Sequence, residues 1–214
     1  DVRGKGPEAA GGANALLGAF RTAAHRAPTL HTLVDMLEQA MLRHTSRREG
    51  PLADEHFASV VAAELSPVTG VLRLLNRGHP APLLLRPGLP GHPSGHGTVR
   101  ALKPVRPGLP LGLRALAPAR GAAGTVALAF PEDATLLLMT DGTTEARDAR
   151  GAFYDPVRRL APYAASTPAE LVRHLRRDVH AHTDGHVRDD MAVLAMRPSR
   201  ARAAASRWET ATTP

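Results

Sequence analysis

The 214-residue sequence contains no cysteine, few aromatic residues and only two lysines. The absence of cysteine excludes disulfide bonds, thiolate metal sites and cysteine nucleophiles, and it leaves the redox compartment open. Because aromatic residues make up only 3% of the chain, the core must be built from leucine, valine and alanine. No apolar run approaches the roughly 20 residues that a membrane-spanning helix needs. With 43% hydrophobic residues, the chain is typical of one sizeable globular domain.

The positive charge of the chain comes almost entirely from arginine. The formal net charge is +7, and Lys5 and Lys103 are the only lysines. The arginines are scattered and form no stripe interleaved with aromatic residues, so the sequence gives little support to a nucleic-acid binder. Their spread among many Ala, Gly and Pro residues is explained more simply as a compositional bias of the source.

Hydrophobic periodicity predicts helices and antiparallel strands in separate stretches of the chain. We expect helices at residues 8–26, 29–45 and 168–183, and strands at residues 57–65, 71–75, 82–86, 98–102, 125–130, 134–139 and 191–196. The first three of these strands are expected to form one antiparallel meander. This order of elements predicts an α+β fold with sheet and helix layers, followed by a disordered tail at residues 198–214.

Three acidic clusters stand at the start of the chain or at the ends of predicted strands. Asp1 opens the sequence, Asp141 follows an apolar strand and precedes Gly142, and Asp189-Asp190 precedes the last strand. Each cluster alone has an ordinary explanation, as a chain terminus, an Asp-Gly turn or a solvated strand start. Together they offer carboxylate oxygens, which are ligands that Mg²⁺ and Mn²⁺ prefer. The sequence therefore predicts a metal centre built from carboxylates.

Five segments carry a recognisable order of motifs. They are DVRGKG at 1–6, NRGHPAPLLL at 76–85, LGL at 111–113, LLLMTDGTTEAR at 136–147 and DDM at 189–191. This order resembles that of the metal-dependent PP2C-type (PPM) serine/threonine phosphatases, in their bacterial SpoIIE/RsbU-like branch. The resemblance implies an α-β-β-α sandwich of two antiparallel sheets flanked by helices, in one phosphatase domain over residues 1–197.

The resemblance also implies roles for individual residues. Asp1 corresponds to the carboxylate that bridges two metal ions, with the Val2 carbonyl beside it, and Asp141 corresponds to a ligand of one ion. Asp189 corresponds to the last ligand, and Asp190 is the alternative at that place. Two Mn²⁺ or Mg²⁺ ions would activate the water that hydrolyses phosphoserine or phosphothreonine without a covalent intermediate.

Four further polar residues lie close to these motifs. Arg3 and Lys5 are candidates for contacts with the substrate phosphate, and a charged terminus is their ordinary explanation. His79 lies in the Asn-Arg-Gly-His-Pro turn and either shapes this turn or approaches the site, and we favour the structural role. Glu145 either orients Asp141 through a hydrogen bond or is an exposed acid. The remaining histidines form no compact ligand set, so we expect no zinc site.

The chain departs from this family pattern at its start. The family has another acidic motif on a strand upstream of the position of Asp1, and this sequence, which begins on Asp1 without an initiator Met, does not contain it. We expect a piece of a longer protein that lacks the first strands of the fold, so that one metal is under-coordinated and a sheet edge is unpaired. An upstream membrane or sensor region stays an open alternative.

The function expected from these observations is that of a bacterial hydrolase in signal transduction. The resemblance implies a protein serine/threonine phosphatase in a sigma-factor regulatory pathway, with phosphoprotein substrates such as STAS-type anti-sigma-factor antagonists. We expect it in the cytoplasm, on its own or as the cytoplasmic domain of a larger membrane-associated protein. The alternative function is a regulatory binding module that kept the PP2C fold and lost catalysis, which the missing upstream acid favours.

Overall fold

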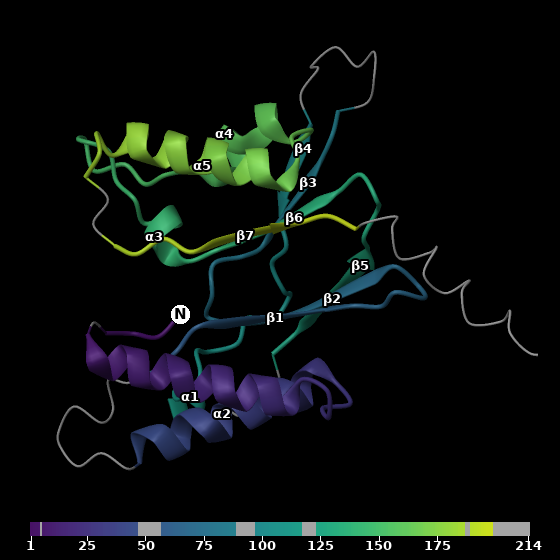
Figure 1. The fold of residues 1–214 in the computed structure, drawn as a ribbon, viewed down its shortest axis with the longest axis vertical. Helices are drawn as coiled ribbons and strands as arrows, with labels where there is room; N and C mark the ends of the chain where they lie inside the picture. The colour runs from purple at the N-terminus through teal and green to yellow at the C-terminus, as the bar shows by residue number, and fades with distance from the viewer. Residues whose placement is uncertain (5, 47–56, 89–96, 117–122, 187–188, 199–214) are drawn as a thin grey trace, which may run out of the picture. The chain divides into compact units, whose positions relative to one another are not determined.

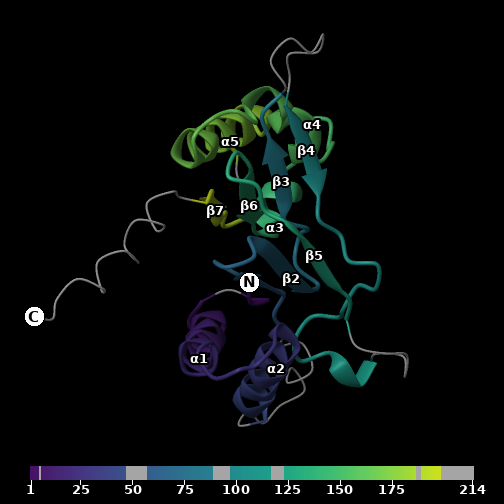
Figure 2. The same cartoon turned by 90° about the vertical axis from the view of Figure 1, so that its right-hand side faces the viewer.

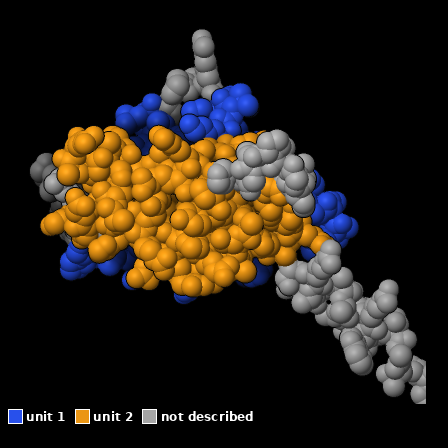
Figure 3. All heavy atoms as spheres, turned by 90° about the horizontal axis from the view of Figure 1, so that it is seen from above, with its two compact units in different colours: residues 1–81, 103–129 blue, residues 82–102, 130–214 orange. Residues whose placement is uncertain are grey.

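The computed structural model describes residues 1–4, 6–46, 57–88, 97–116, 123–186 and 189–198. The chain divides into two compact units, each built from two stretches of sequence (Figure 3). Unit 1 consists of residues 1–81 and 103–129, and unit 2 of residues 82–102 and 130–214. Each unit contains one antiparallel sheet with helices packed against it. The expected α+β class, with two antiparallel sheets flanked by helices, is therefore confirmed.

Unit 1 holds a three-stranded sheet in the order β1-β2-β5. Its strands are β1 (Val60–Leu65), β2 (Val71–Arg77) and β5 (Thr125–Ala129). Its helices are α1 (Pro7–Ala23), α2 (Leu30–Thr45) and the short 3-10 helix η2 (Arg114–Leu116). Helices α1 and α2 lie side by side against one face of this sheet (Figures 1 and 2).

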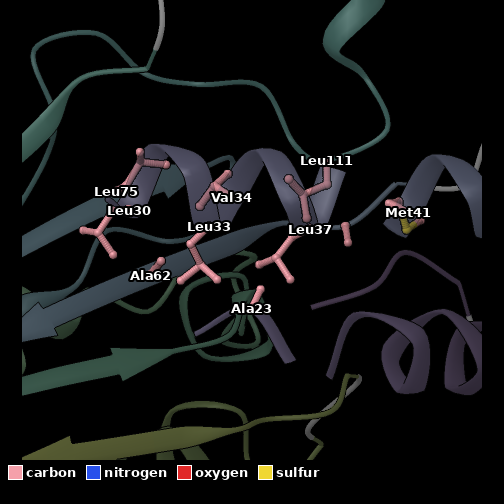
Figure 4. Packing of buried hydrophobic residues seen from close by; sticks show 10 residues of the cluster. Ala23, Leu30, Leu33, Val34, Leu37, Met41, Ala62, Leu75 and Leu111 are labelled. Atoms are coloured by element: carbon pink, nitrogen blue, oxygen red, sulfur yellow. The ribbon is translucent and has the colours of Figure 1, made fainter. Parts of the chain in front are cut away.

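The amphipathic pattern of α2 explains the core of unit 1. Thr29 caps the helix, because its side chain accepts a hydrogen bond from the Thr32 N–H at 3.1 Å. Apolar side chains recur at intervals of three and four positions along α2 and face the sheet. The buried cluster that they build consists of Ala23, Leu30, Leu33, Val34, Leu37, Met41, Ala58, Ala62, Leu75 and Leu111 (Figure 4).

Unit 2 holds a four-stranded sheet in the order β4-β3-β6-β7. Its strands are β3 (Leu83–Arg86), β4 (Thr98–Ala101), β6 (Thr135–Met139) and β7 (Val193–Met196). Its helices are α3 (Asp141–Thr144), α4 (Pro156–Leu160), η3 (Ala161–Tyr163) and α5 (Pro168–His182). Helices α4 and α5 cover one face of this sheet (Figures 1 and 2).

Helix α5 is the longest helix of the described part of unit 2, and its start is well defined. Thr167 and Glu170 form a capping box, in which each side chain accepts a hydrogen bond from the backbone N–H of the other. Leu171, Leu175 and Val179 are buried along one face of the helix. They belong to the core of unit 2 together with Leu83, Leu85, Leu137, Met139, Tyr154, Leu160 and Ala164.

The expected meander of residues 57–65, 71–75 and 82–86 is wrong. Strand β3 pairs with β4 and β6, whereas β2 pairs with β1 and β5. The connection between β2 and β3 contains Pro80 and Pro82, which lack the N–H that a continuing ladder would need. The chain therefore leaves the first sheet at this connection, and β5 takes the second edge of β2.

The other expected elements agree with the structure to within a few residues. The last strand begins at Val193 rather than at 191, and α3 and α4 are too short to show a periodic pattern. Most of the expected loop at 87–97 and of the tail at 198–214 lies outside the described residues. The tail and the single domain over residues 1–197 stay predictions. Among the described helices, none combines the length and the apolar character that a membrane crossing requires.

Candidate metal centre

The pairing of β6 with β7 brings two of the three acidic clusters to one end of the unit 2 sheet. These strands are antiparallel, with Met139 opposite Val193 at the last paired position. Asp141 comes two residues after Met139, and the Asp189-Asp190 pair ends three residues before Val193. Because one antiparallel strand ends where its neighbour begins, these acidic residues become neighbours although they are far apart in the sequence.

Thr140 ties the two acidic segments together. Its N–H donates to the Ala192 carbonyl oxygen at 3.0 Å, and its Oγ1 accepts a hydrogen bond from the Ala192 N–H at 3.0 Å. Its hydroxyl also donates to the Asp190 carbonyl oxygen at 3.3 Å. Reasoning from the sequence misses this residue, although a hydroxyl between an apolar strand and an Asp-Gly step is a signal for such a side-chain-to-backbone tie.

Gly142 is required by the close approach of the same two segments. A Cβ atom at this position would lie 2.3 Å from the carbonyl oxygen of Asp190 and 3.4 Å from that of Asp189. Both obstacles are backbone atoms, which cannot rotate away as a side chain can. Glycine therefore allows the first turn of α3 to pack directly against the segment at 189–190.

The carboxylates in this part of unit 2 differ in their exposure. Asp141 is half-buried at the start of α3, and its carbonyl oxygen accepts the Glu145 N–H at 2.7 Å. Asp189 and Asp190 are both exposed, and the Asp190 N–H donates to Asp189 Oδ1 at 3.0 Å. The Glu145 side chain is also exposed, and a hydrogen bond from it that orients Asp141 stays a prediction.

In unit 1, the Asp1 segment pairs with the residues just before β1. The Ser59 N–H donates to the Asp1 carbonyl oxygen at 2.8 Å, and the Arg3 N–H donates to the Phe57 carbonyl oxygen at 2.9 Å. Val2 lies between these two hydrogen bonds and turns its own N–H and C=O to the opposite side. The pairing therefore does not use the Val2 carbonyl oxygen, which the sequence predicts as a metal ligand.

His79 lies beside this pairing. Its Nδ1 shares a hydrogen bond of 2.8 Å with Oγ of Ser59, the residue that pairs with Asp1. Two reciprocal hydrogen bonds with Asn76 close the turn, from the His79 N–H to Asn76 Oδ1 at 2.9 Å and from Asn76 Nδ2 to the His79 carbonyl oxygen at 2.8 Å. The turn is thus closed through the His79 backbone and the Asn76 side chain, while the His79 ring contacts Ser59, which reasoning from the sequence does not single out.

Of the two candidate phosphate contacts, Arg3 lies within the described residues and Lys5 does not. Arg3 is exposed, and its guanidinium carbon lies 5.2 Å from the centroid of the Phe57 ring. This cation–π contact directs the side chain without burying its charge. Lys5 lies outside the described residues. A substrate contact stays a prediction for both.

The acidic residues are divided between the two units. Asp1 belongs to unit 1, whereas Asp141, Asp189 and Asp190 belong to unit 2. Within the described residues, no group of three or more His, Asp or Glu side chains is clustered so that it could hold a metal ion. The donor chemistry nevertheless fits Mg²⁺ or Mn²⁺, because it consists of carboxylate and carbonyl oxygens. The ligand assignments to these residues stay predictions.

A second polar cluster in unit 2 joins α4 to α5. Arg159 on α4 donates two hydrogen bonds of 2.7 Å to the Asp178 carboxylate on α5, and the Tyr154 hydroxyl donates a third of 2.7 Å. The hydrogen bonds from Arg159 are the main reason that the pKa of Asp178 is lowered. Burial and the nearby carboxylate raise the pKa of Tyr154. This arrangement is explained by helix packing and needs no catalytic role.

Comparison with known proteins relates this geometry to solved structures. The chain is similar to the RsbU and RsbW domains of a Mycobacterium tuberculosis protein, with 23% identity, a TM-score of 0.66, and 92% of this chain and 49% of that one covered. It is similar to the SiaA PP2C domain of Pseudomonas aeruginosa, with 16% identity, a TM-score of 0.68, and 93% and 73% covered. It is also similar to RsbX in complex with magnesium, with 13% identity, a TM-score of 0.57, and 90% and 75% covered.

These likenesses show that the fold is that of the PP2C phosphatases. The chain spans about half the length of the first of these structures. No curated protein matches it by sequence. The sequence model of the family described as Stage II sporulation protein E (SpoIIE) matches residues 1–199. With this match and this fold, the chain belongs to the SpoIIE family of PP2C-type phosphatase domains.

Proposed function

We propose that the chain is a metal-dependent protein serine/threonine phosphatase that acts in a signalling pathway. The pairing of β6 with β7 carries this proposal, because it places Asp141 beside the Asp189-Asp190 segment and requires glycine at position 142. Carboxylate oxygens gathered at one end of a sheet are the ligand type that Mg²⁺ and Mn²⁺ prefer. Membership of the SpoIIE family supports phosphoester hydrolysis as the reaction type.

The proposed metal ligands are those that the sequence resemblance implies. They are Asp1, the Val2 carbonyl, Asp141 and Asp189, with Asp190 as the alternative to Asp189. Two Mn²⁺ or Mg²⁺ ions held there would supply a water of lowered pKa and would neutralise charge on the phosphoryl oxygens. The magnesium in the similar RsbX structure supports the choice of a divalent ion. The contribution of unit 2 is the β6–β7 pairing, which brings the backbone of the Asp141 segment to that of the segment at 189–190.

The proposed substrate is a phosphoserine or phosphothreonine protein. A STAS-type anti-sigma-factor antagonist is the substrate class that the sequence resemblance implies. The similar structure that joins an RsbU domain to an RsbW domain supports a regulatory protein partner. Arg3 and Lys5 are proposed to contact the phosphate group, as charged donors commonly do. The proposed setting is the cytoplasm, either for this protein alone or as the cytoplasmic domain of a larger membrane-associated one.

The test of this proposal is the release of phosphate from a phosphoserine protein with and without Mn²⁺. Asp141→Asn removes a charged ligand and keeps the side-chain shape, so we expect activity to fall by roughly 100-fold or more, because ligand charge is needed to hold the ions. Asp184→Asn is the matched control, since Asp184 is exposed and its φ of 48° is one that asparagine tolerates. Equal activity of Asp141→Asn and the unmodified protein, or activity independent of Mn²⁺, would contradict the proposal.

Calorimetric titration of Mn²⁺ separates the phosphatase from a regulatory binding module. Tight binding at two sites is expected for the phosphatase and rejects a module that has lost its metal centre. The absence of any Mn²⁺ binding would instead favour the module.

A further inference from the structure

We infer that Glu38 is a positioning residue for the Asp1 segment of unit 1, which carries the proposed metal ligands Asp1 and Val2. From its buried place in α2, Glu38 holds the segment at 109–112. This segment orders the Asp1 segment through the backbone of residues 57–59, which lies between them. This inference rests on the proposed function, because it concerns the Asp1 and Val2 ligands of the same centre.

Glu38 is a charged residue on the core face of an amphipathic helix. Its side chain is 0% exposed, and it lies one helical turn from Val34 and next to Leu37, both of which are buried. A carboxylate in such surroundings is tolerated only when its oxygens are paired and hydrogen-bonded.

Both partners of Glu38 connect it to the segment at 109–112. Glu38 Oε1 accepts the Gly112 N–H at 2.9 Å, and Oε2 accepts a hydrogen bond from Arg77 Nη2 at 3.1 Å. Arg77 Nε in turn donates to the Leu109 carbonyl oxygen. One buried ion pair thus binds both ends of this segment.

The segment at 109–112 forms one edge of a small backbone ladder. The Leu111 N–H donates to the Ala58 carbonyl oxygen at 2.8 Å, and the Ala58 N–H donates to the Leu111 carbonyl oxygen at 3.1 Å. Ala58 also lies opposite Val2. Its neighbour Ser59 binds the Asp1 backbone and the His79 ring. The ladder therefore runs from the Glu38 hydrogen bonds to the Asp1 segment within unit 1.

Close packing leaves the partners of Glu38 little freedom to rearrange. A Cβ atom on Gly108 would lie 2.4 Å from Arg77 Cδ, so the arginine stem lies directly against this backbone. Gly112 has a φ of +90°, a conformation that favours glycine. If Glu38 lost its charge, Arg77 could not move to another acid without disturbing residues 108–112.

The carboxylate contributes hydrogen bonds that an apolar side chain could not supply. A leucine or methionine at position 38 would bury apolar surface against the sheet, and replacing a buried ion pair by apolar residues is often neutral or stabilising. The stability of α2 alone therefore does not explain Glu38. The specific consequence of the carboxylate is that residues 109–112, and with them the ladder, keep one position.

The test is residue-resolved hydrogen exchange on the metal-free protein, which at 22.6 kDa is suited to NMR. In Glu38→Gln we expect the amides of Leu111, Ser59 and Arg3 to exchange at least roughly tenfold faster, as local opening of the ladder becomes easier. We also expect Mn²⁺ affinity to fall roughly 10–100-fold, the range for residues that support metal ligands.

Two further variants separate positioning from stability. Asp35→Asn is the matched control on α2, because its ion pair with Arg114 at 2.9 Å has side chains that are 56% and 61% exposed, and we expect no change. The double variant Glu38→Leu with Arg77→Met removes both charges together. We expect it to keep the melting temperature within a few degrees, since such replacements are often tolerated, but to leave the ladder amides fast-exchanging.

The outcomes for the two proposals can be told apart. Unchanged exchange at the three ladder amides in both Glu38 variants would overturn the positioning role, whatever happens to the metal. If the unmodified protein binds no Mn²⁺, the proposed metal centre fails, and the exchange rates alone decide whether Glu38 orders the Asp1 segment.

Discussion

The substitution Gly142→Ala tests whether the approach of α3 to the segment at 189–190 holds the acidic residues of unit 2 together. The added Cβ would lie 2.3 Å from the Asp190 carbonyl oxygen and 3.0 Å from its carbonyl carbon. A carbon and a carbonyl oxygen in contact normally lie about 3.3–3.6 Å apart, so α3 or the Asp190 backbone must move by roughly 1 Å. The movement would separate Asp141 from its acidic neighbours.

The expected cost of Gly142→Ala follows from the nature of the obstacle. Overpacking a tightly packed site costs about 1–3 kcal/mol of the free energy of unfolding. Since the Asp190 carbonyl is backbone and is also bound by Thr140, we expect the upper part of this range, about 2–3 kcal/mol. For a chain of this length each 1 kcal/mol lowers the melting temperature by about 2–4 °C, which gives a decrease of about 4–12 °C.

Thermal unfolding and Mn²⁺ titration of the same samples provide the assay. Gly18→Ala is the matched control, because Gly18 lies in α1 and an added Cβ would have no atom of the described residues within 4 Å beyond its chain neighbours and the backbone of its own helix. We expect this control to stabilise the protein by about 0.5–1 kcal/mol, since alanine favours helix. A Gly142→Ala protein with the melting temperature and Mn²⁺ affinity of the unmodified protein would refute the reasoning.

Two further predictions concern the hydrogen bonds of unit 2. Because the pKa of Asp178 is lowered from 3.8, chiefly by Arg159, its stabilisation is present above pH 3.8 and is lost as the pH falls through the lower native value. At neutral pH we expect Asp178→Asn to lower the free energy of unfolding by about 1–2 kcal/mol, the size of a partly exposed ionic hydrogen bond. Denaturant titrations should show this difference shrinking as the pH falls below 3.8. Thr140→Val keeps the side-chain shape but removes two hydrogen bonds between residue 140, just after β6, and the segment before β7. We expect a loss of about 1–2 kcal/mol and weaker Mn²⁺ binding, and unchanged values in both measurements would show that Thr140 does not tie these segments together.

The local structure around Asp141 and Asp189 could be predicted from the sequence because its signals are local. An apolar run that ends in Thr140-Asp141-Gly142 predicts a strand followed by a turn. The structure has the strand β6, and the chain then enters the short helix α3 in place of a simple turn. The helix caps at Thr29 and Thr167 likewise depend only on nearby residues, because each side chain accepts a hydrogen bond from the N–H three residues later. Such features depend on neighbours in the chain, so reasoning from the sequence reaches them.

Strand partners could not be predicted in the same way. Three consecutive short strands favour a meander, but β2 takes β5 as its second neighbour and β3 enters the other sheet. The choice of strand partner depends on apolar burial between segments that are distant in sequence. The prolines at 80 and 82 indicate only that the ladder is interrupted there, not which strand pairs next. The role of Glu38 is an intermediate case, because it stands four positions after Val34 and three before Met41 and so falls on the apolar face of α2.

The division of each unit into two stretches of sequence affects how the protein is made. Strand β2 ends at Arg77 and its partner β5 begins 48 residues later at Thr125. At roughly 5–20 residues per second, the ribosome needs about 2–10 s to supply that partner, and it makes β3 and β4 of the other sheet in the meantime. Neither sheet can be completed before the other has begun, so the two must assemble in an interleaved order. Ending synthesis at residue 81 or 102 would therefore release partial sheets rather than a finished unit.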